Sequence, residues 1–253
     1  MHYAGVSCDM DRITAIAKKY KLYVVEDAAQ GIGAYYKGRH LGTIGDIGAI
    51  SFHETKNLTC GEGGVFLTNK KKIALSAEMI REKGTDRSRF LRGEVDKYTW
   101  RSVGSSFLLS DILSGVLLAQ LHKITAINES RKKIYKIYME EFKVLQNKGR
   151  ITLPYIPTAC KSNYHSFHIL LPSRKQRDRC MAVLNEKGIK ACFHYIPLHS
   201  SPFAKKNLGY KAKDLPITEN LSGRLLRLPL YAGLKTVEID YIVRNVRKVL
   251  KVL

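Results

Sequence analysis

Three residues with reactive side chains stand at or just after the ends of apparent buried strands. Asp27 closes the run LYVVED, Ser51 lies near the end of IGAISF, and Lys56 follows Ser51 by five residues. A lysine can form a Schiff base with an aldehyde and later move a proton, a carboxylate can pair with a ring nitrogen, and a hydroxyl can donate to a phosphate. These are the groups that chemistry with pyridoxal 5'-phosphate requires.

Each of these features, taken singly, also has an ordinary structural interpretation. Asp27 could cap a helix, Lys56 could be a solvated loop lysine, and the GEGG turn at 61–64 could be a plain turn. Gln30 alone is an ordinary polar residue. Two other kinds of site are disfavoured, because no His, Cys and Asp set shows metal-ligand spacing and no GxSxG motif is present.

The first half of the chain alternates helical and strand patterns. A helix is predicted over 9–20 with Asp9 as its N-cap, followed by strands over 22–27, 47–52 and 64–68 and a helix over 70–83. Short connections between alternating helices and strands favour a parallel or mixed α/β sheet. Ligands of such sheets bind at the carboxyl ends of the strands, where Asp27, Ser51 and Lys56 lie.

The pattern changes near residue 110 and predicts a smaller α+β unit. Its expected elements are a helix over 110–127 capped by Ser110, a helix over 131–145, a strand over 166–171, a helix over 174–187, a strand over 190–195 and a final helix near 236–250. We therefore expect the C-terminal portion of a cofactor-binding large domain over residues 1–128 and a small domain over 129–253.

Composition narrows the class of protein. Of 253 residues, 45% are apolar and 26% are charged, which is ordinary for a globular protein. The sequence contains no run of about 18 apolar residues, so no membrane span is expected. No secretory signal is recognisable at its start. Five dispersed cysteines indicate reduced thiols, so a cytoplasmic location is expected. The net charge is +21, but the sequence contains no nucleic-acid-binding motif, so nucleic acid is not an expected partner.

Longer stretches carry a resemblance to a known family. The segment from VVEDAAQG through HETKNLTCGEGG resembles the core of the DegT/DnrJ/EryC1/StrS family of sugar aminotransferases, which have the fold-type I architecture and use pyridoxal 5'-phosphate. The stretches REKGTDRSRFLRGEVDKYTWRSVGSSFLLSD and FHYIPLH resemble those of dTDP-4-amino-4,6-dideoxygalactose transaminases. The similarity runs from His2 to the C-terminus.

The resemblance implies cofactor-binding roles at matching positions. Lys56 would form the Schiff base and act as the acid and base of the proton shift, Asp27 would hold the ring nitrogen, and Gln30 would contact the 3-hydroxyl face. Ser51 would reach the phosphate. A lysine at position 56 also separates this chain from the dehydratase branch of the family, which carries histidine there.

The resemblance also implies a substrate and its contacts. His194 and Tyr195 would line a sugar-nucleotide pocket, unless they are packed strand residues, and Lys83 and Arg87 would meet a diphosphate, unless they only face solvent. The implied reaction transfers the amino group of L-glutamate to a nucleotide-linked 4-keto-6-deoxy sugar, dTDP-4-keto-6-deoxy-D-glucose, in cell-surface polysaccharide (lipopolysaccharide) biosynthesis. A homodimer is implied as well.

Two departures from the family pattern stand out. Many members have an asparagine that reaches the neighbouring subunit's cofactor phosphate where this chain has Ser105 and Ser106, and we assign Ser106 to that position. The family's fold also begins well before His2, with a helix and a turn that cradle the cofactor phosphate. We therefore expect an N-terminally truncated member, and the alternative to an active enzyme is a non-catalytic fragment without that cradle.

Overall fold

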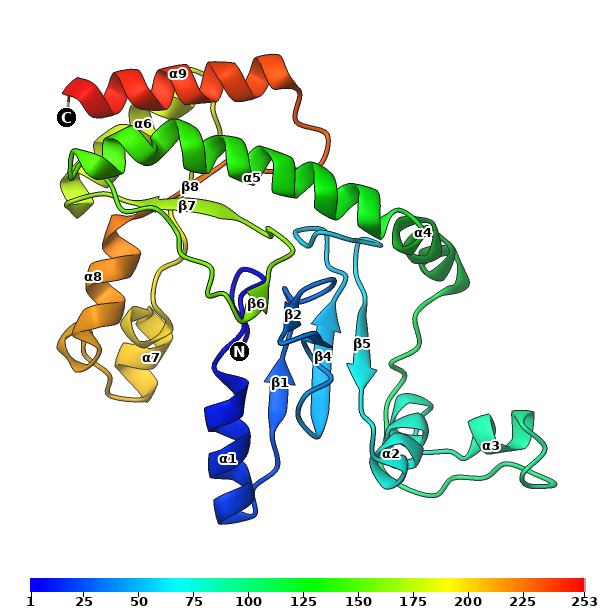
Figure 1. Ribbon diagram of the computed structural model, residues 1–253. Coiled ribbons are helices and arrows are strands. Elements are labelled where there is room, and N and C mark those ends of the chain that lie inside the picture. Colours follow the sequence, from blue (N-terminus) through cyan, green and yellow to red (C-terminus); the bar gives the residue numbers. More distant parts are fainter. Residues whose placement is uncertain (253) are drawn as a thin grey trace. The chain divides into compact units, whose positions relative to one another are not determined.

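Strand β4 (Ile47–Ser51) is the middle strand of a three-stranded sheet in the first of two compact units (Figure 1). The computed structural model describes residues 1–252. Unit 1 comprises residues 1–128 and 156–165, and unit 2 comprises 129–155 and the described residues from 166 onward. Each unit is described by itself below.

Unit 1 contains two small sheets and four helices of its own. Its elements in chain order are α1 (Met10–Tyr20), β1 (Val25–Asp27), β2 (Tyr35–Tyr36), β3 (Arg39–His40), β4, β5 (Gly64–Leu67), α2 (Lys71–Arg81), α3 (Arg87–Leu91), α4 (Asp111–Leu121) and β6 (Cys160–Lys161), with the first turn of α5 (Ile124–Asn147). The sheet β1–β4–β5 is mixed, because β4 runs parallel to β1 and antiparallel to β5. The second sheet has the order β3–β2–β6 and is antiparallel.

Local capping explains where the helices begin. The carboxylate of Asp9 accepts a hydrogen bond from the amide of Arg12 at the start of α1, as predicted, and Ser110 does the same for Leu113 at the start of α4. Such side-chain caps satisfy amides that have no partner within the helix. The core of unit 1 collects apolar side chains from α1, both sheets and the loops between them, including Met10, Ala28, Ala34, Tyr36, Leu41, Ile50, Phe52 and Leu58.

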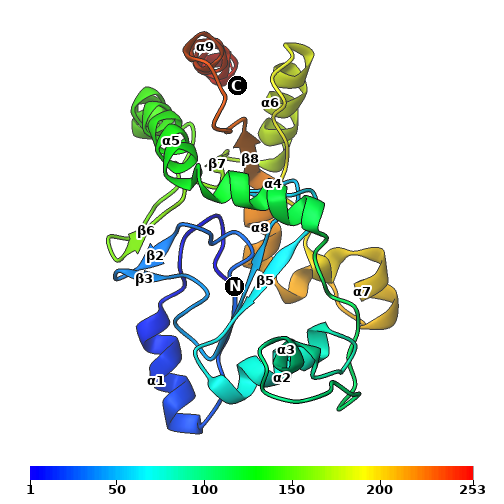
Figure 2. The same cartoon turned by 90° about the vertical axis from the view of Figure 1, so that its right-hand side faces the viewer.

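Unit 2 is built on a two-stranded antiparallel sheet. Its elements are most of α5, β7 (Phe167–Leu170), α6 (Arg174–Glu186), α7 (Pro202–Asn207), α8 (Pro216–Arg224), β8 (Leu225–Leu228) and α9 (Thr236–Val252), with short 3₁₀ turns at Leu198–Ser200 and Ala212–Asp214. Helices α5, α6 and α9 lie on the same side of β7 and β8 (Figure 2). Aromatic rings fix the contact of α5 with β7, since the rings of Tyr135 and Tyr138 lie 5.1 and 5.0 Å from that of Phe167.

Two predicted elements are wrong. The helix expected over 110–127 is interrupted after Leu121, and α5 starts at Ile124. The turn allows apolar residues on both sides of it, such as Leu117 and Ile127, to pack against the core of unit 1. Residues 190–195 do not form a strand, because Cys192 is the one residue among them that pairs, through an isolated bridge to Arg227.

The domain boundary predicted after residue 128 stays a prediction. One feature of unit 1 was not part of that prediction. Residues 156–165 return to unit 1, where Cys160 and Lys161 pair with Tyr36 and Tyr35 of β2. This pairing adds a third strand to the smaller sheet of unit 1. This late segment of the chain therefore belongs to the unit that contains Asp27, Ser51 and Lys56.

Candidate active site

Parallel pairing brings Asp27 and Ser51 to the same edge and the same face of the sheet. Asp27 at the end of β1 pairs with Ala49 of β4, and Ser51 lies two residues beyond Ala49. Because strand residues two apart share a face, Ser51 stands on the face that Asp27 occupies. The amide of Ala28 donates to the carbonyl of Ala49 at 2.9 Å, which continues the ladder one residue past Asp27.

Lys56 lies in the tight loop that follows β4. The loop is closed by hydrogen bonds from the amide of Phe52 to the carbonyl of Gly63 and from the amide of Cys60 to the carbonyl of Phe52. Within it, the amide of Lys56 donates to the carbonyl of His53 at 2.9 Å, which forms a turn. Lys56 is half-buried, and its Nζ has no hydrogen-bond or ion-pair partner within residues 1–252.

Gln30 is held by the first residues of the chain. Its Oε1 accepts a hydrogen bond of 2.6 Å from the amide of Ala4. The Gln30 side chain is half-buried, in the loop that follows β1. The amide group of its side chain keeps its Nε2 donors for a ligand, because only Oε1 is engaged.

The polar groups at this edge suit pyridoxal 5'-phosphate. One oxygen of Asp27, Oδ1, accepts from the amide of Ala29 at 3.1 Å, so the second oxygen can accept a hydrogen bond from a protonated pyridine nitrogen. The hydroxyl of Ser51 accepts from the amide of His53 at 3.2 Å and retains its own hydrogen for a phosphate oxygen. Together with the unengaged amine of Lys56, these donors and acceptors fit the cofactor.

Lys83, Arg87 and Ser106 belong to a different segment of unit 1. The segment folds back on itself, since Glu82 and Ser106 form an isolated bridge and the amide of Lys83 donates to the carbonyl of Ser105 at 3.1 Å. Backbone pairing therefore places Lys83 opposite Ser105, the residue before Ser106, and all three predicted side chains are exposed.

A buried carboxylate holds this segment together. Asp86 is 1% exposed and accepts hydrogen bonds of 2.7 Å from the amide of Thr99 and from Nε of Arg101. The bond from Thr99 and the guanidinium of Arg101 hold the pKa of Asp86 below its usual value. Asp86 was not predicted from the sequence, although an acid inside a segment rich in arginine is a usable signal.

His194 and Tyr195 lie in unit 2 and differ in their surroundings. His194 is buried, and its Nδ1 lies 3.0 Å from a guanidinium nitrogen of Arg227. Burial first, and then the charge of Arg227, lower the pKa of His194 to about 4. Tyr195 is 61% exposed. The neutral imidazole of His194 is therefore a hydrogen-bonding group at neutral pH, while Tyr195 presents its ring to solvent.

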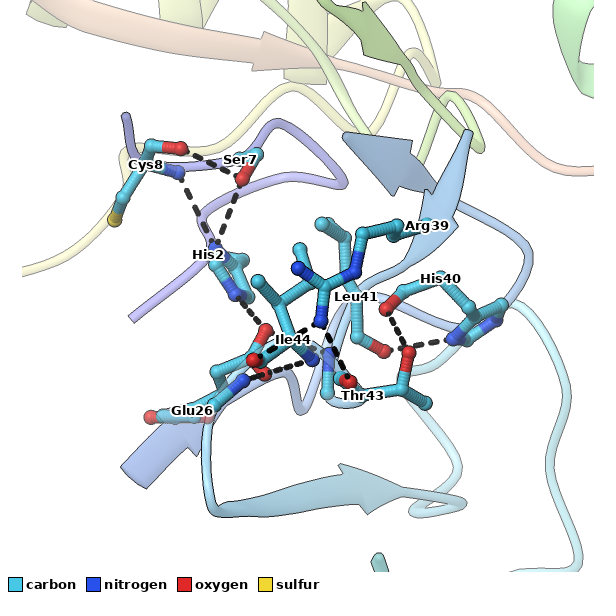
Figure 3. A network of polar contacts seen from close by, with 12 residues as sticks. His2, Ser7, Cys8, Glu26, Arg39, His40, Leu41, Thr43 and Ile44 are labelled. Carbon is cyan, nitrogen blue, oxygen red and sulfur yellow. Dashed lines mark hydrogen bonds and ion pairs between the residues drawn. The ribbon is translucent and has the colours of Figure 1, made fainter. Parts of the chain in front are cut away.

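Glu26 and His2 form a buried polar network next to Asp27 that the sequence interpretation missed (Figure 3). Glu26 is 2% exposed, and its carboxylate accepts from the ring of His2 and from three backbone amides, those of Gly42, Ile44 and Gly45. The amide of His2 also donates to the carbonyl of Asp27 at 2.8 Å. The signal available in the sequence was an acid inside an otherwise apolar strand.

No helix within residues 1–252 is long and apolar enough to span a bilayer. Nor does any cluster of three His, Cys, Asp or Glu side chains there have the arrangement of a metal site.

Comparisons with known proteins agree with the α/β fold. Protein MJ1066 of Methanocaldococcus jannaschii is 36% identical over 98% of this chain, and the spore coat polysaccharide biosynthesis protein SpsC of Bacillus subtilis is 31% identical over 99%. The structure of the putative sugar aminotransferase Spr1654 from Streptococcus pneumoniae, in its PLP form, matches 99% of the chain with a TM-score of 0.86 and 25% identity. The predicted fold class is confirmed by such structures.

The matches extend over almost all of this chain but over only part of the relatives. The chain spans 65% of MJ1066, 66% of SpsC and 67% of the Spr1654 chain. A shortened span is what the resemblance predicted. The model of the DegT/DnrJ/EryC1/StrS aminotransferase family matches residues 1–247, and the chain belongs to that family.

Proposed function

We propose that this chain is the catalytic part of a pyridoxal 5'-phosphate-dependent enzyme that transfers the amino group of L-glutamate to a nucleotide-linked 4-keto-6-deoxy sugar. The observation that carries the proposal is the placement of Asp27 and Ser51 on one face at one sheet edge, with an unengaged lysine in the next loop. The sugar proposed is dTDP-4-keto-6-deoxy-D-glucose, and the pathway proposed is surface polysaccharide synthesis in the cytoplasm. The relative SpsC, a spore coat polysaccharide biosynthesis protein, supports the proposed pathway.

Each residue has a task that follows from its surroundings. When bound, the cofactor supplies an electron sink for the carbanion formed next to the transferred nitrogen. Asp27 would pair its carboxylate with the pyridine nitrogen, and Ser51 would donate to the phosphate. Lys56 would hold the cofactor, and its Nζ, once released, would move the proton that the transfer requires. Gln30 directs Nε2 at the ring's hydroxyl.

Substrate contacts are proposed for four of the residues that the sequence singled out. Lys83 and Arg87 are exposed cations suited to the diphosphate of a nucleotide sugar. His194, neutral at pH 7, and Tyr195 are proposed to contact the sugar nucleotide. Phosphates attract basic surfaces over distances of a Debye length, about 8 Å at physiological ionic strength, so the net charge of +21 would favour the encounter.

A homodimer is proposed from the surface near Ser106. Ser106 is exposed, and so are the apolar side chains that flank it, with Trp100 at 75%, Val103 at 87% and Phe107 at 66% exposed. Apolar side chains gathered in one exposed segment are typical of an interaction surface. In a dimer built on this segment, Ser106 could donate to the partner's cofactor phosphate. Sedimentation of the purified chain tests the assembly.

A chain without activity of its own is the alternative function. The outer strands of the central sheet favour it, because Val25 of β1 is 64% exposed and Phe66 of β5 is 47% exposed. Relatives are also about half as long again as the matched region. On this alternative, further polypeptide of the same fold is needed before the cofactor binds.

One experiment separates the two functions. The purified chain is mixed with pyridoxal 5'-phosphate and reduced with borohydride, and the modified peptide is identified by mass spectrometry. The proposal expects modification at Lys56, lost in Lys56→Ala and kept in Lys97→Ala, an exposed lysine of the same unit that serves as the control. A folded chain that gives no adduct at Lys56 would support the inactive alternative.

The donor and acceptor are tested by half-reactions. With L-glutamate alone, the loaded protein should release one equivalent of 2-oxoglutarate, and the aminated protein should then convert the keto sugar without glutamate. Ping-pong kinetics follows from this order. Release of 2-oxoglutarate with no conversion of the dTDP sugar would keep the transaminase and reject the proposed acceptor.

A further inference from the structure

Asn163 links the two loops that carry the candidate site residues, although it lies more than a hundred residues along the chain from either. It is fully buried, at 0% exposure. Its side-chain Nδ2 donates two hydrogen bonds of 2.8 Å, to the carbonyls of Gln30 and Ile32 in the loop after β1. One carboxamide therefore pairs with two carbonyls of the loop that follows Asp27.

The same residue also holds the loop that contains Lys56. Asn57, the next residue after Lys56, is 8% exposed, and its Nδ2 donates to the backbone carbonyl of Asn163 at 2.8 Å. The Oδ1 atom of Asn57 lies 2.9 Å from Nδ1 of His165. Asn57 is thus fixed at both ends of its carboxamide by one short segment, 163–165.

The orientation of the Asn163 carboxamide is determined by its partners. Turned the other way, its oxygen would face the carbonyl oxygens of Gln30 and Ile32, which would repel it. In the observed orientation Oδ1 is buried without a hydrogen-bond partner, against Gly5. A Cβ at Gly5 would lie 1.9 Å from this oxygen, and the φ of Gly5 is +75°. Leaving a buried oxygen unpaired costs stability, and the two bonds made by Nδ2 offset that cost.

The network reaches Gln30 from two sides. Asn163 holds its backbone carbonyl, and the amide of Ala4, next to Gly5, donates to its side-chain Oε1 at 2.6 Å. Backbone and side chain of Gln30 are therefore restrained by different parts of unit 1. A shift of Asn163 would displace both Gln30 and the turn of Lys56.

We propose that Asn163 and Asn57 are positioning residues that keep the Gln30 loop and the Lys56 loop at the spacing the cofactor needs. The proposal rests on the proposed function, since it assigns these loops to cofactor binding. Neither asparagine touches the reacting atoms, because the Nδ2 groups of both bond to backbone carbonyls and Oδ1 of Asn57 pairs with His165. Their effect is exerted through the geometry of the residues they hold.

Two variants and an exposed control test the proposal. Asn163→Leu keeps the approximate volume and removes both donors, and Asn57→Asp keeps shape and acceptor but removes the donor to the Asn163 carbonyl. Asn185→Leu is the control, because its Nδ2 likewise donates to two carbonyls, those of Met181 and Ala191 in unit 2. Three quantities are measured: the dissociation constant of pyridoxal 5'-phosphate, the rate at which the borohydride-trapped adduct forms at Lys56, and the rates of amide hydrogen exchange.

The expected results distinguish positioning from a merely structural role. Well below the unfolding temperature, Asn163→Leu and Asn57→Asp should each weaken cofactor binding about tenfold, the loss that one or two hydrogen bonds produce. Because both act on one link, the double variant should be little weaker than either single variant. Amides in residues 28–34 and 52–60 should exchange faster together in Asn163→Leu. Asn185→Leu should change none of these.

Contrary outcomes are equally clear. Unchanged cofactor affinity and unchanged exchange in both Asn163→Leu and Asn57→Asp would overturn the positioning role. If the wild-type chain forms no Lys56 adduct, the proposed function fails, and hydrogen exchange then decides the link alone. Faster exchange of both loops would support the link in that case, and faster exchange of one loop only would refute it.

Discussion

The imidazole of His2 donates a hydrogen bond of 2.8 Å from Nε2 to Oε2 of Glu26, and both side chains are almost fully buried. The tautomer follows from the other nitrogen, since Nδ1 accepts from the amide of Cys8 at 3.2 Å. Burial raises the pKa of Glu26, but the bonds from His2 and from three backbone amides outweigh it and hold the pKa below its usual value. Glu26 is therefore a charged anchor for the end of β1.

Replacing Glu26 by glutamine should destabilise unit 1. The new amide group would face at least one of the donors of His2, Gly42, Ile44 and Gly45, and an unsatisfied buried group costs about 2–4 kcal/mol. The free energy of unfolding in urea measures the effect. Glu54→Gln is the control, because Glu54 is exposed, and it should change stability by less than about 0.5 kcal/mol.

The same variant carries a pH signature. Glu26 has a lower pKa folded than unfolded, so its contribution is present above the unfolded value and is lost as pH falls through the folded value. The difference between wild type and Glu26→Gln should therefore be largest at neutral pH and shrink below the ordinary glutamate pKa of about 4.3. A difference that does not depend on pH would contradict the assignment of a charged Glu26.

Asn at position 27 should weaken cofactor binding without unfolding the protein. Asp27→Asn keeps the acceptor for Ala29 but removes the charge that would pair with a protonated ring nitrogen. A hydrogen bond to a charged group contributes about 1.5–3 kcal/mol, so the dissociation constant of pyridoxal 5'-phosphate should rise roughly 10- to 100-fold. Fluorescence titration measures it. An unchanged constant would remove Asp27 from the cofactor site.

Alanine at Gly48 should disrupt the sheet beside the site. A Cβ there would lie 2.0 Å from the carbonyl oxygen of Gly42, and backbone cannot yield as a flexible side chain does. Strain of this kind costs roughly 3 kcal/mol. The control is Gly115→Ala in α4, where the added carbon meets nothing within 4 Å and should stabilise the helix by up to about 1 kcal/mol. Thermal unfolding compares the two.

His194 should titrate far below an ordinary histidine. Burial and the charge of Arg227 place its pKa at about 4, whereas the unfolded chain titrates near the usual value of about 6.5. The unfolded state therefore binds more protons between these values, and unit 2 should lose on the order of 1–3 kcal/mol as pH falls from about 6.5 to about 4. Above about pH 6.5 the imidazole is neutral in both the folded and the unfolded state, so this loss of stability is absent. Proton NMR of the ring measures the pKa, and a midpoint near 6.5 would reject the buried environment.

Gln at position 194 serves as the comparison for that titration. Its carbonyl can still accept from Arg227, but it does not ionise. His194→Gln should therefore flatten the acid side of the stability curve without altering stability much at pH 8. If the curve keeps its slope, another group is responsible for the loss.

Local chemistry in the sequence determined the helix starts and the order of the chemical groups. Asp9 and Ser110 were predicted as caps from their type and position, and the structure shows both accepting the expected amides. Asp27, Ser51 and Lys56 could be grouped because carboxyl ends of neighbouring parallel strands meet at one sheet edge. Their roles toward the cofactor stay predictions.

Long-range pairing could not be inferred in the same way. Strands β2 and β6 have two residues each and lie more than a hundred residues apart, so neither leaves a periodic pattern. The strand predicted at 190–195 does not form, although its sequence is strand-like, because this segment has only Arg227 as a cross-strand partner. Short strands are determined by the neighbour available to them, which depends on the rest of the fold.

The support of the site was decided by tertiary structure alone. Asp27 and Lys56 are recognisable by residue type. Nothing near them in the sequence indicates that Glu26 is hydrogen-bonded by His2 and three backbone amides, or that Asn163 bonds to both loops. A buried hydrogen bond has meaning only when its partner is known, and these partners are 16 to 133 residues away. The sequence by itself determined which groups could react, and folding decided what holds them in place.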